Sequence, residues 1–318
     1  MRVLALTGPT ASGKTALSLH LAHSLSGEII SCDSMQIYRG MDIGTAKATA
    51  AEQAQIRHHL IDVVSPDENY SAEDYRTDAL RAVRDVTSRD RLPIFVGGTG
   101  LYIDTVMRGG VPESPPSDSS VRDRLAREAE RDGADSLWRR LLQIDPASAE
   151  KIHPNNVRRV IRALEIYELS GRTKSYFDER SREASSDLSV GMITLDFHNR
   201  DLLYSRIDAR VGEMIAAGLA GEVRALCERG LLRPEYTSAQ AIGYKEMLAY
   251  IRGECTLDEA VELIKLSSRR YAKRQLTWFR HEKDAVRIFV DGEDGLIKPR
   301  EALADEALLA ARALLSGD

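Results

Sequence analysis

Residues 8 to 15 read GPTASGKT and match the phosphate-binding pattern G-x-x-x-x-G-K-[ST]. The two glycines let the backbone curl so that several N–H groups point at one anion. Lys14 adds a positive charge, and Thr15 offers a hydroxyl group to a divalent metal ion. The alternative is a glycine-rich turn with a surface lysine. We predict a phosphate site, and its residues are Gly8, Pro9, Thr10, Ala11, Ser12, Gly13, Lys14 and Thr15.

Asp33 follows a short apolar run that is typical of a buried strand. In doubly wound sheets, ligands bind beyond the carboxyl ends of the strands. We therefore expect Asp33 to face the same crevice as the phosphate loop. Its carboxylate could contact a metal ion or act as a general base. The alternative is that Asp33 only caps a turn or a helix.

Two further segments have the composition of functional loops. Residues 36–47 read QIYRGMDIGTAK and show no clean period, which is typical of a long loop that carries function. Residues 96–102 read VGGTGLY, and three glycines within four residues allow a ligand to approach the backbone closely. The alternative for the second segment is a tight strand-to-helix turn. No guanine-recognition motif (Asn/Thr-Lys-x-Asp) is present in the sequence, which argues against a GTPase.

Two segments are basic although the chain as a whole is acidic. Arg158 and Arg162 are four residues apart and share one helix face, with Arg159 between them. Residues 268–281 contain several arginines and lysines and no acidic residue. Tyr271, Trp278 and Phe279 also lie in this segment. Basic groups bind phosphates and aromatic rings stack on bases, but a solvated helix face is the alternative for both segments. For Trp278 and Phe279 we expect a place in the core.

The elements that must position these residues alternate at first between strand and helix and then become helical. This order predicts an α/β fold with a parallel sheet flanked by helices, carried by residues 1–113 and 190–318. An all-helical insertion domain is predicted over residues 114–189, and within it 172–188 is expected to be irregular. The expected strands are Val3–Leu6, Glu28–Ser31, His59–Val63, Pro93–Val96, Met192–Phe197 and Val286–Val290. Among the expected helices are Ala72–Val86, Asn155–Leu169, Ala239–Arg252 and Leu257–Phe279.

Composition limits the protein class. The chain has 318 residues, 43% of them hydrophobic and 29% charged, with a net charge of −5, which is an ordinary globular composition. The three cysteines are far apart and lack C-x-x-C spacing, so neither a disulfide framework nor a zinc site is predicted. No apolar stretch approaches the roughly 20 residues of a membrane helix. We expect no secretory signal, no membrane contact and a cytoplasmic monomer.

Taken together, several motifs resemble the tRNA dimethylallyltransferases, the family of tRNA isopentenyltransferases. The resemblance spans about 280 residues, and the family's motifs occur in its order and spacing. The two most specific motifs are DSMQIYRGMDIGTAK at Asp33–Lys47 and KRQLTWFR at Lys273–Arg280. The others are GPTASGKT, HHLID at His58–Asp62, YSAEDY at Tyr70–Tyr75, VGGTGLY, HPNNVRRVIRALE at His153–Glu165 and QAIGYKE at Gln240–Glu246. The implied core fold is P-loop NTPase-like.

The resemblance implies transfer of a dimethylallyl group from dimethylallyl diphosphate to N6 of adenine at tRNA position 37. Gly13, Lys14 and Thr15 would then hold the diphosphate and Mg²⁺, with Thr15 as the protein's metal ligand. Asp33 would take the proton from N6 as the nitrogen attacks C1 of the donor. Arg274 would make a further diphosphate contact. The residues implied as catalytic are Asp33, Thr15 and Lys14.

The same resemblance implies that the insertion grips the anticodon stem-loop of tRNA. The target adenine must leave its stack to reach the donor, at a cost of a few kcal/mol. The residues implied in tRNA binding are Asp33, Ser34, Met35, Gln36, Thr99, Arg158, Arg159, Arg162 and Gln240.

Two other classes of protein share some of these features. A small-molecule or nucleoside kinase would explain the phosphate loop and a base at Asp33, but not the arginine-rich insertion or KRQLTWFR. A non-catalytic RNA-binding protein that uses a nucleotide as a switch would bind tRNA without changing its mass. A product of C5-prenylated tRNA distinguishes the transferase from both.

Overall fold

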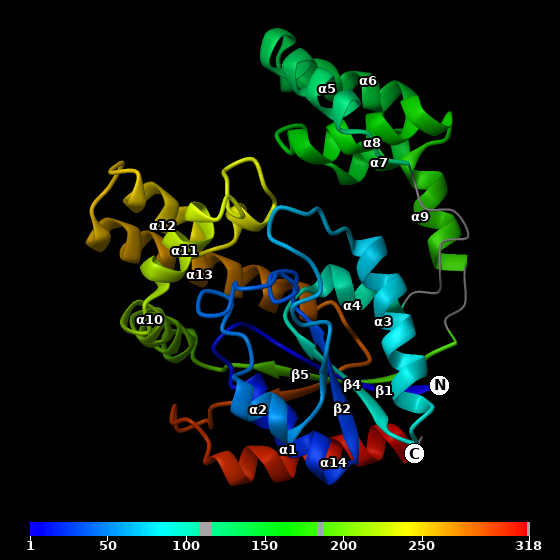
Figure 1. The fold of residues 1–318 in the computed structure, drawn as a ribbon. Coiled ribbons are helices and arrows are strands. Elements are labelled where there is room, and N and C mark those ends of the chain that lie inside the picture. The colour runs from blue at the N-terminus through cyan, green and yellow to red at the C-terminus, as the bar shows by residue number, and fades with distance from the viewer. Residues whose placement is uncertain (108–115, 184–186, 317–318) are drawn as a thin grey trace. The chain divides into compact units, whose positions relative to one another are not determined.

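The structure is a computed structural model that describes residues 1–107, 116–183 and 187–316 (Figure 1). The chain divides into two compact units, one of Met1–Met107 with Leu188–Asp318 and one of Arg108–Asp187. The domain boundary predicted at residues 113 and 114 lies outside the described residues. The boundary predicted at residues 189 and 190 falls just after the observed division.

The larger unit is built on a six-stranded sheet in the order β3-β2-β4-β1-β5-β6. Every neighbouring pair of strands is parallel, so all carboxyl ends lie at one edge. The predicted α/β fold with a parallel sheet is confirmed. The strands are β1 Arg2–Thr7, β2 Gly27–Cys32, β3 His58–His59, β4 Leu92–Gly97, β5 Ser189–Asp196 and β6 Val286–Phe289.

The strand predicted over His59–Val63 is wrong except at its first residue. Only His58 and His59 pair with β2. Leu60 and Asp62 have φ angles of 60° and 58°, which are left-handed values that a strand does not allow. The chain therefore leaves the sheet here, and Val63 instead donates its backbone N–H to the carbonyl of Ile37 at 2.7 Å.

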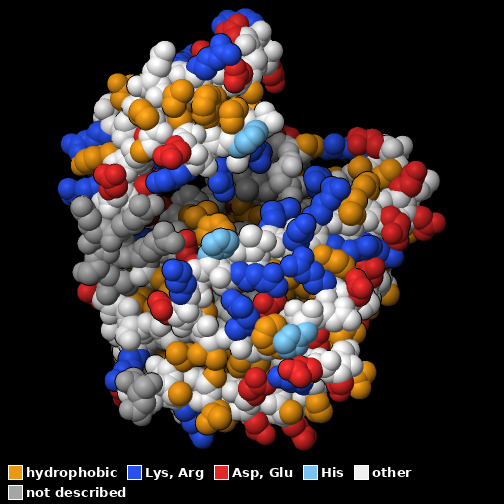
Figure 2. Space-filling view, turned by 180° about the vertical axis from the view of Figure 1, so that it is seen from behind, with side chains coloured by type: hydrophobic (Ala, Val, Ile, Leu, Met, Phe, Trp, Pro, Cys, Tyr) orange, Lys and Arg blue, Asp and Glu red, His pale blue; other side chains and the backbone are white. Residues whose placement is uncertain are grey.

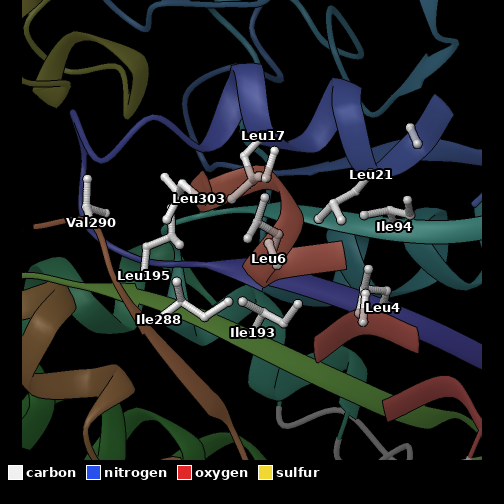
Figure 3. Close-up of a cluster of buried hydrophobic side chains, with 14 of the residues drawn as sticks. Leu4, Leu6, Leu17, Leu21, Ile94, Ile193, Leu195, Ile288, Val290 and Leu303 are labelled. Carbon is white, nitrogen blue, oxygen red and sulfur yellow. The ribbon is translucent and has the colours of Figure 1, made fainter. Parts of the chain in front are cut away.

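Both faces of the sheet are buried, and this is why the strands read as continuous apolar runs. Leu4 and Leu6 of β1 face the helices α1 (Lys14–Ser24) and α14 (Arg300–Ser316), as Figure 3 shows for Leu17, Leu21 and Leu303. The alternate residues Val3 and Ala5 face α3 (Ala72–Thr87) and α4 (Gly100–Met107) on the other side. A fully buried leucine contributes about 2 kcal/mol, so this layering fixes the register of β1.

A second core joins the C-terminal helices to the loop that follows β2. Ile37, Tyr38 and Met41 of that loop are buried in it. The helices around this part of the unit are α10 Arg200–Ala216, α11 Leu219–Glu228, α12 Tyr244–Ile251 and α13 Leu257–Phe279. The single helix predicted over Ala239–Arg252 is wrong at its start. A 3-10 turn at Ser238–Gln240 comes first, and Gly243 with φ 94° separates it from α12.

The smaller unit is helical over its described residues, and Leu125, Leu137 and Leu164 are central to its core. The irregular segment predicted over 172–188 is wrong over Lys174–Glu183, where α9 forms. Residues 184–186 of that segment lie outside the described residues. Asp145 accepts the backbone N–H of Ser175 at 3.0 Å and so stabilises the first turn of α9. The helices are α5 Ser119–Asp132, α6 Ala134–Ile144, α7 Pro146–Lys151, α8 Val157–Ser170 and α9 Lys174–Glu183. No helix within residues 1–107, 116–183 and 187–316 combines the length and apolar character that crossing a membrane requires.

Candidate active site

The phosphate loop connects β1 to α1 at the carboxyl edge of the sheet. Gly8 has a φ of 139°, and a Cβ atom there would lie 2.9 Å from the carbonyl oxygen of Leu195. Gly13 has a φ of 93° at the start of α1. The hydroxyl of Ser12 donates to the carbonyl of Pro9 at 2.8 Å and tightens the curl. The glycines therefore stand where the sequence pattern requires them.

Lys14 is folded back into this loop. Its Nζ donates to the carbonyls of Gly8 at 3.0 Å and Pro9 at 2.5 Å. Burial, together with the charge of the nearby Arg210, lowers the pKa of Lys14 to about 7, although Asp33 acts in the opposite direction. The side-chain amine is therefore about half-protonated at neutral pH, and a bound anion would favour its protonated form.

Asp33 lies directly after β2 and begins a turn. Its Oδ1 accepts the backbone N–H of Met35 at 2.9 Å, so Asp33 does cap a turn. The hydroxyl of Thr99, beyond β4, accepts the backbone N–H of Ser34 at 3.2 Å. The backbone N–H of Thr99 donates to the carbonyl of Cys32 at 3.2 Å. These bonds hold Asp33 and Thr99 side by side at the ends of neighbouring strands.

Two cavities meet at Asp33. The larger, of about 440 Å³, is lined by the phosphate loop, the start of α1, Ser31, Gln36 and His58. The smaller, of about 280 Å³, is lined by apolar side chains such as Ile207, Val211 and Met214 and by polar or charged ones that include Ser34, Gln240 and Arg274. The residues that line both are Thr10, Asp33, Thr45, Arg210 and Tyr271. A group held by the phosphate loop and a second group in the smaller cavity would therefore meet at the Asp33 carboxylate.

Two arginines of α10 complete the positive surface around the phosphate loop, and the sequence analysis missed both. The Nε of Arg206 donates to the carbonyl of Ala11 at 2.8 Å. Arg210 donates to the hydroxyl of Thr10 at 3.2 Å, and burial lowers its pKa although Asp33 and Glu213 raise it. Their spacing of four residues on the helix after β5 was the available signal.

Gln275 of α13 joins the phosphate loop to the loop after β4, and it too was missed. Its Oε1 accepts the backbone N–H of Thr10 at 2.9 Å, and its Nε2 donates to the carbonyl of Gly98 at 3.0 Å. A Cβ atom on Gly98 would lie 1.9 Å from that Nε2. The backbone of the glycine-rich VGGTGLY segment therefore lies close to the buried amide of Gln275. The same segment also forms the turn into α4.

The residues described in the structure contain no group of three or more His, Cys, Asp or Glu side chains arranged to hold a metal ion. A Mg²⁺ ion bound with a diphosphate needs few protein ligands, because it keeps several waters and uses phosphate oxygens. Thr15 lines the larger cavity at the start of α1 and can supply one hydroxyl ligand. The residues present therefore fit a magnesium ion that arrives with its phosphate ligand.

Comparison with known proteins identifies the group to which the chain belongs. The sequence profile described as IPP transferase matches residues 36–282. This chain belongs to the IPP transferase family. The tRNA dimethylallyltransferase of Geobacter sulfurreducens is 46% identical over 281 residues, covering 88% of this chain and 89% of that protein. The tRNA dimethylallyltransferase of Bacillus subtilis is 48% identical over 281 residues, with 88% of each chain covered.

Solved structures of IPP transferase relatives share the fold. The tRNA isopentenylpyrophosphate transferase of Bacillus halodurans is 42% identical with a TM-score of 0.71, and the match covers 99% of this chain and 97% of that one. A eukaryotic dimethylallyltransferase described as acting on tRNA is 28% identical with a TM-score of 0.79, covering 99% and 80%. The resemblance inferred from the motifs is thereby confirmed, as is the P-loop-like core.

Two residues of α13 in this IPP transferase, Tyr271 and Arg274, line the smaller cavity. Burial raises the pKa of Tyr271, and Thr99 acts in the opposite direction. The guanidinium carbon of Arg274 lies 5.6 Å from the centroid of the Tyr271 ring. Arg274 lines the smaller cavity and is not among the residues around the larger one, where the phosphate loop lies.

Most residues predicted to contact tRNA near the target line one of the two cavities, whereas Thr99 lines neither. Ser34, Met35 and Gln240 line the smaller cavity. Gln36 lines the larger cavity, and its Oε1 accepts the hydroxyl of Ser31 at 2.9 Å. The Nε2 of Gln240 donates to the carbonyl of Pro234 at 2.9 Å.

The three arginines predicted to bind tRNA from α8 have different surroundings. Arg158 and Arg159 are exposed at the start of α8. Arg162 instead donates to the carboxylate of Glu165 at 2.7 Å and to the carbonyl of Pro116 at 2.8 Å. Because the Glu165 side chain is fully buried, it needs such a partner. Arg162 therefore stabilises a buried carboxylate, a structural role that was not predicted from the sequence.

The basic segment of α13 is only partly as expected. Phe279 is 1% exposed and lies in the core as predicted, but Trp278 is 37% exposed, so its predicted place in the core is wrong. Its ring lies against Gly100, where a Cβ atom would be 2.4 Å from the indole. Arg270, Lys273 and Arg274 are exposed along the same helix. Figure 2 shows that Lys and Arg side chains gather near the middle of one face of the protein.

Proposed function

We propose that this IPP transferase transfers the dimethylallyl group of dimethylallyl diphosphate to N6 of adenine at position 37 of tRNA. The observation that carries the proposal is the position of Asp33, which lies where the cavity at the phosphate loop meets a second, partly apolar cavity. The relatives named tRNA dimethylallyltransferase support the donor and the acceptor. We also propose a monomer as the active form.

The donor would lie with its diphosphate on the phosphate loop. Backbone N–H groups of the loop and the positive charges of Lys14, Arg206 and Arg210 surround that position. Thr15 would hold Mg²⁺, which supplies charge neutralisation of the diphosphate when it is bound. The fixed donors stabilise the negative charge that develops on the leaving group as its bond to C1 breaks. Arg274 would add a contact from the wall of the smaller cavity.

The acceptor would enter the smaller cavity and present N6 to Asp33. A carboxylate has about four lone-pair sites, so the bond from Met35 leaves capacity for a second donor. Asp33 would accept a hydrogen bond from N6 and take its proton as the nitrogen attacks C1. Thr99, whose hydroxyl accepts the backbone N–H of Ser34, would fix the turn that carries Asp33 beside the reacting atoms.

The rest of the RNA would be held by residues around the target base. Ser34, Met35 and Gln240 line the smaller cavity and Gln36 lines the larger one, and we assign contacts with bases around the target to these four residues. Arg158, Arg159 and Arg162 of the smaller unit would bind phosphates of the anticodon stem-loop. Arg162 would do so with the part of its positive charge that Glu165 does not neutralise.

The proposal is tested by mass spectrometry of tRNA. Unmodified tRNA would be incubated with the protein, Mg²⁺ and dimethylallyl diphosphate, and its nucleosides would be separated. The expected result is one C5 prenyl group on the adenosine beside the anticodon. A second reaction with ATP in place of the donor tests the kinase alternative. Bound tRNA without a mass gain, or a phosphorylated product, would overturn the proposal.

A further inference from the structure

The loop that follows β2 is held by one carboxylate from a distant helix. Glu222 of α11 accepts the backbone N–H groups of Asp42 at 3.0 Å and Ile43 at 2.8 Å on Oε2. Its Oε1 accepts the backbone N–H of Gly44 at 3.3 Å. Three consecutive N–H groups thus converge on one side chain, which fixes the conformation of this part of the loop. Charge-assisted bonds of this kind are about twice as strong as neutral ones.

The same carboxylate also holds the beginning of α12. The phenol of Tyr244 donates to Oε1 of Glu222 at 2.5 Å. Tyr244 is fully buried, and its ring lies so close to Gly44 that a Cβ atom there would be 2.4 Å from its Cε2. Burial, with the charge of Glu222 next, raises the pKa of Tyr244, so the phenol remains a donor throughout the physiological range.

Both groups bound by Glu222 lead directly to the smaller cavity. Gly44 and Thr45 line it from the loop, and Gln240, Ala241 and Ile242 line it from the segment just before Tyr244. Glu222 and Tyr244 do not themselves line either cavity. The Glu222 carboxylate is therefore the junction between two walls of the cavity, and it contacts neither of the two proposed substrates.

We propose that Glu222 and Tyr244 are positioning residues that set the separation between the two walls of the cavity for the acceptor base. This inference rests on the proposed function, because it assigns the smaller cavity to the acceptor. Loss of the junction lets residues 42–45 and 240–242 move independently, and the base then binds a cavity of the wrong width. The phosphate loop is anchored separately, by Gln275 and Arg206, and of residues 42–45 only Thr45 also lines the larger cavity, so binding of inorganic diphosphate is largely spared.

The sharpest perturbation is Tyr244→Phe, which removes one hydroxyl and keeps the ring against Gly44. We expect the KM for tRNA to rise about tenfold, the fold-change of one hydrogen bond to a charged group. Binding of inorganic diphosphate, measured by calorimetry, should stay within twofold. Backbone hydrogen exchange over residues 42–45 should accelerate, and this readout does not depend on activity. The matched control is Tyr70→Phe. It removes the hydrogen bond of 3.0 Å that the Tyr70 phenol donates to the carboxylate of Asp78, and neither residue lines a cavity described above.

A second variant tests the same junction by size. Gly44→Ala pushes the loop away from the Tyr244 ring, so the KM for tRNA should rise and diphosphate binding should again be preserved. Its control is Gly212→Ala on α10, where a Cβ atom meets nothing within 4 Å.

The possible outcomes separate this inference from the proposed function. Suppose that the wild type is active and that the Tyr244→Phe and Gly44→Ala variants keep its KM for tRNA and its slow backbone exchange over residues 42–45. This result would overturn the positioning role alone. Equal losses of tRNA and diphosphate binding would also overturn it, because they indicate general damage. A wild type that never prenylates tRNA would overturn the proposed function, while the exchange measurement still reports on the junction.

Discussion

The affinity for diphosphate should fall as the pH rises through 7, because of Lys14. The ligand-free protein lowers the pKa of this ammonium group from 10.5 to about 7, chiefly by burial. A bound diphosphate favours the charged form and therefore raises that pKa. Binding thus takes up a proton whenever Lys14 starts neutral, and the linkage makes binding tighter at lower pH.

The size of the effect follows from the fraction of Lys14 that is protonated. With a pKa of about 7, this fraction is roughly 0.9 at pH 6 and roughly 0.1 at pH 8. The contribution of Lys14 to the affinity should then fall about tenfold between these pH values, which is about 1.4 kcal/mol. At pH 8, each diphosphate that binds should be accompanied by the uptake of about 0.9 proton at Lys14.

Calorimetry with inorganic diphosphate and Mg²⁺ in buffers of different ionisation enthalpy measures both quantities. The control is Lys14→Arg, whose guanidinium stays charged across this range. The ligand's own ionisation contributes equally to both proteins, so the difference between them isolates Lys14. Equal proton uptake and equal pH dependence in wild type and Lys14→Arg would refute the reasoning, since Lys14 would then be charged before the ligand arrives.

Three other perturbations give distinct expected results. Asp33→Ala should lower turnover by a factor on the order of 10² to 10⁴ and leave tRNA binding nearly intact, as measured by single-turnover kinetics and filter binding; unchanged turnover would remove Asp33 from the mechanism. Arg159→Ala should weaken tRNA binding and reduce the slope of log affinity against log salt by about one, whereas a loss confined to donor affinity would contradict its placement. Gly97→Ala should lower the free energy of unfolding in urea by at least about 1–3 kcal/mol, because the new Cβ would lie 2.0 Å from the carbonyl oxygen of Cys32; an unchanged urea midpoint would count against the strand spacing described for β2 and β4.

The parts of the site that the sequence predicted are those whose geometry is local. The phosphate loop carries its own glycines and lysine within eight residues, so its pattern specifies its shape. Asp33 could be placed because it follows a strand, and parallel strands end at one edge of the sheet. Its position beside the loop needed only the prediction that β1 and β2 belong to the same parallel sheet.

The parts that were missed depend on contacts between distant segments. Arg206 and Gln275 contact the phosphate loop from about 195 and 265 residues away in the chain. No local pattern distinguishes them from the other arginines and glutamines of amphipathic helices. The prediction of an irregular segment over 172–188 was wrong for the same reason, because the polarity of these residues hides a helix, α9. Its first turn is stabilised by Asp145, the residue before α7.

Non-glycine residues in left-handed conformations show why these distant contacts are needed. Ala11 in the phosphate loop has a φ of 61° and Ala46 in the loop after β2 has a φ of 45°. Such conformations cost about 1 kcal/mol or more for a residue with a Cβ atom, so the local sequence alone does not favour them. At Ala11 the carbonyl accepts Arg206, and near Ala46 the backbone is held by Glu222. The motif therefore identifies the chemistry of the site, whereas helices α10 and α11 impose the conformation in which that chemistry can operate.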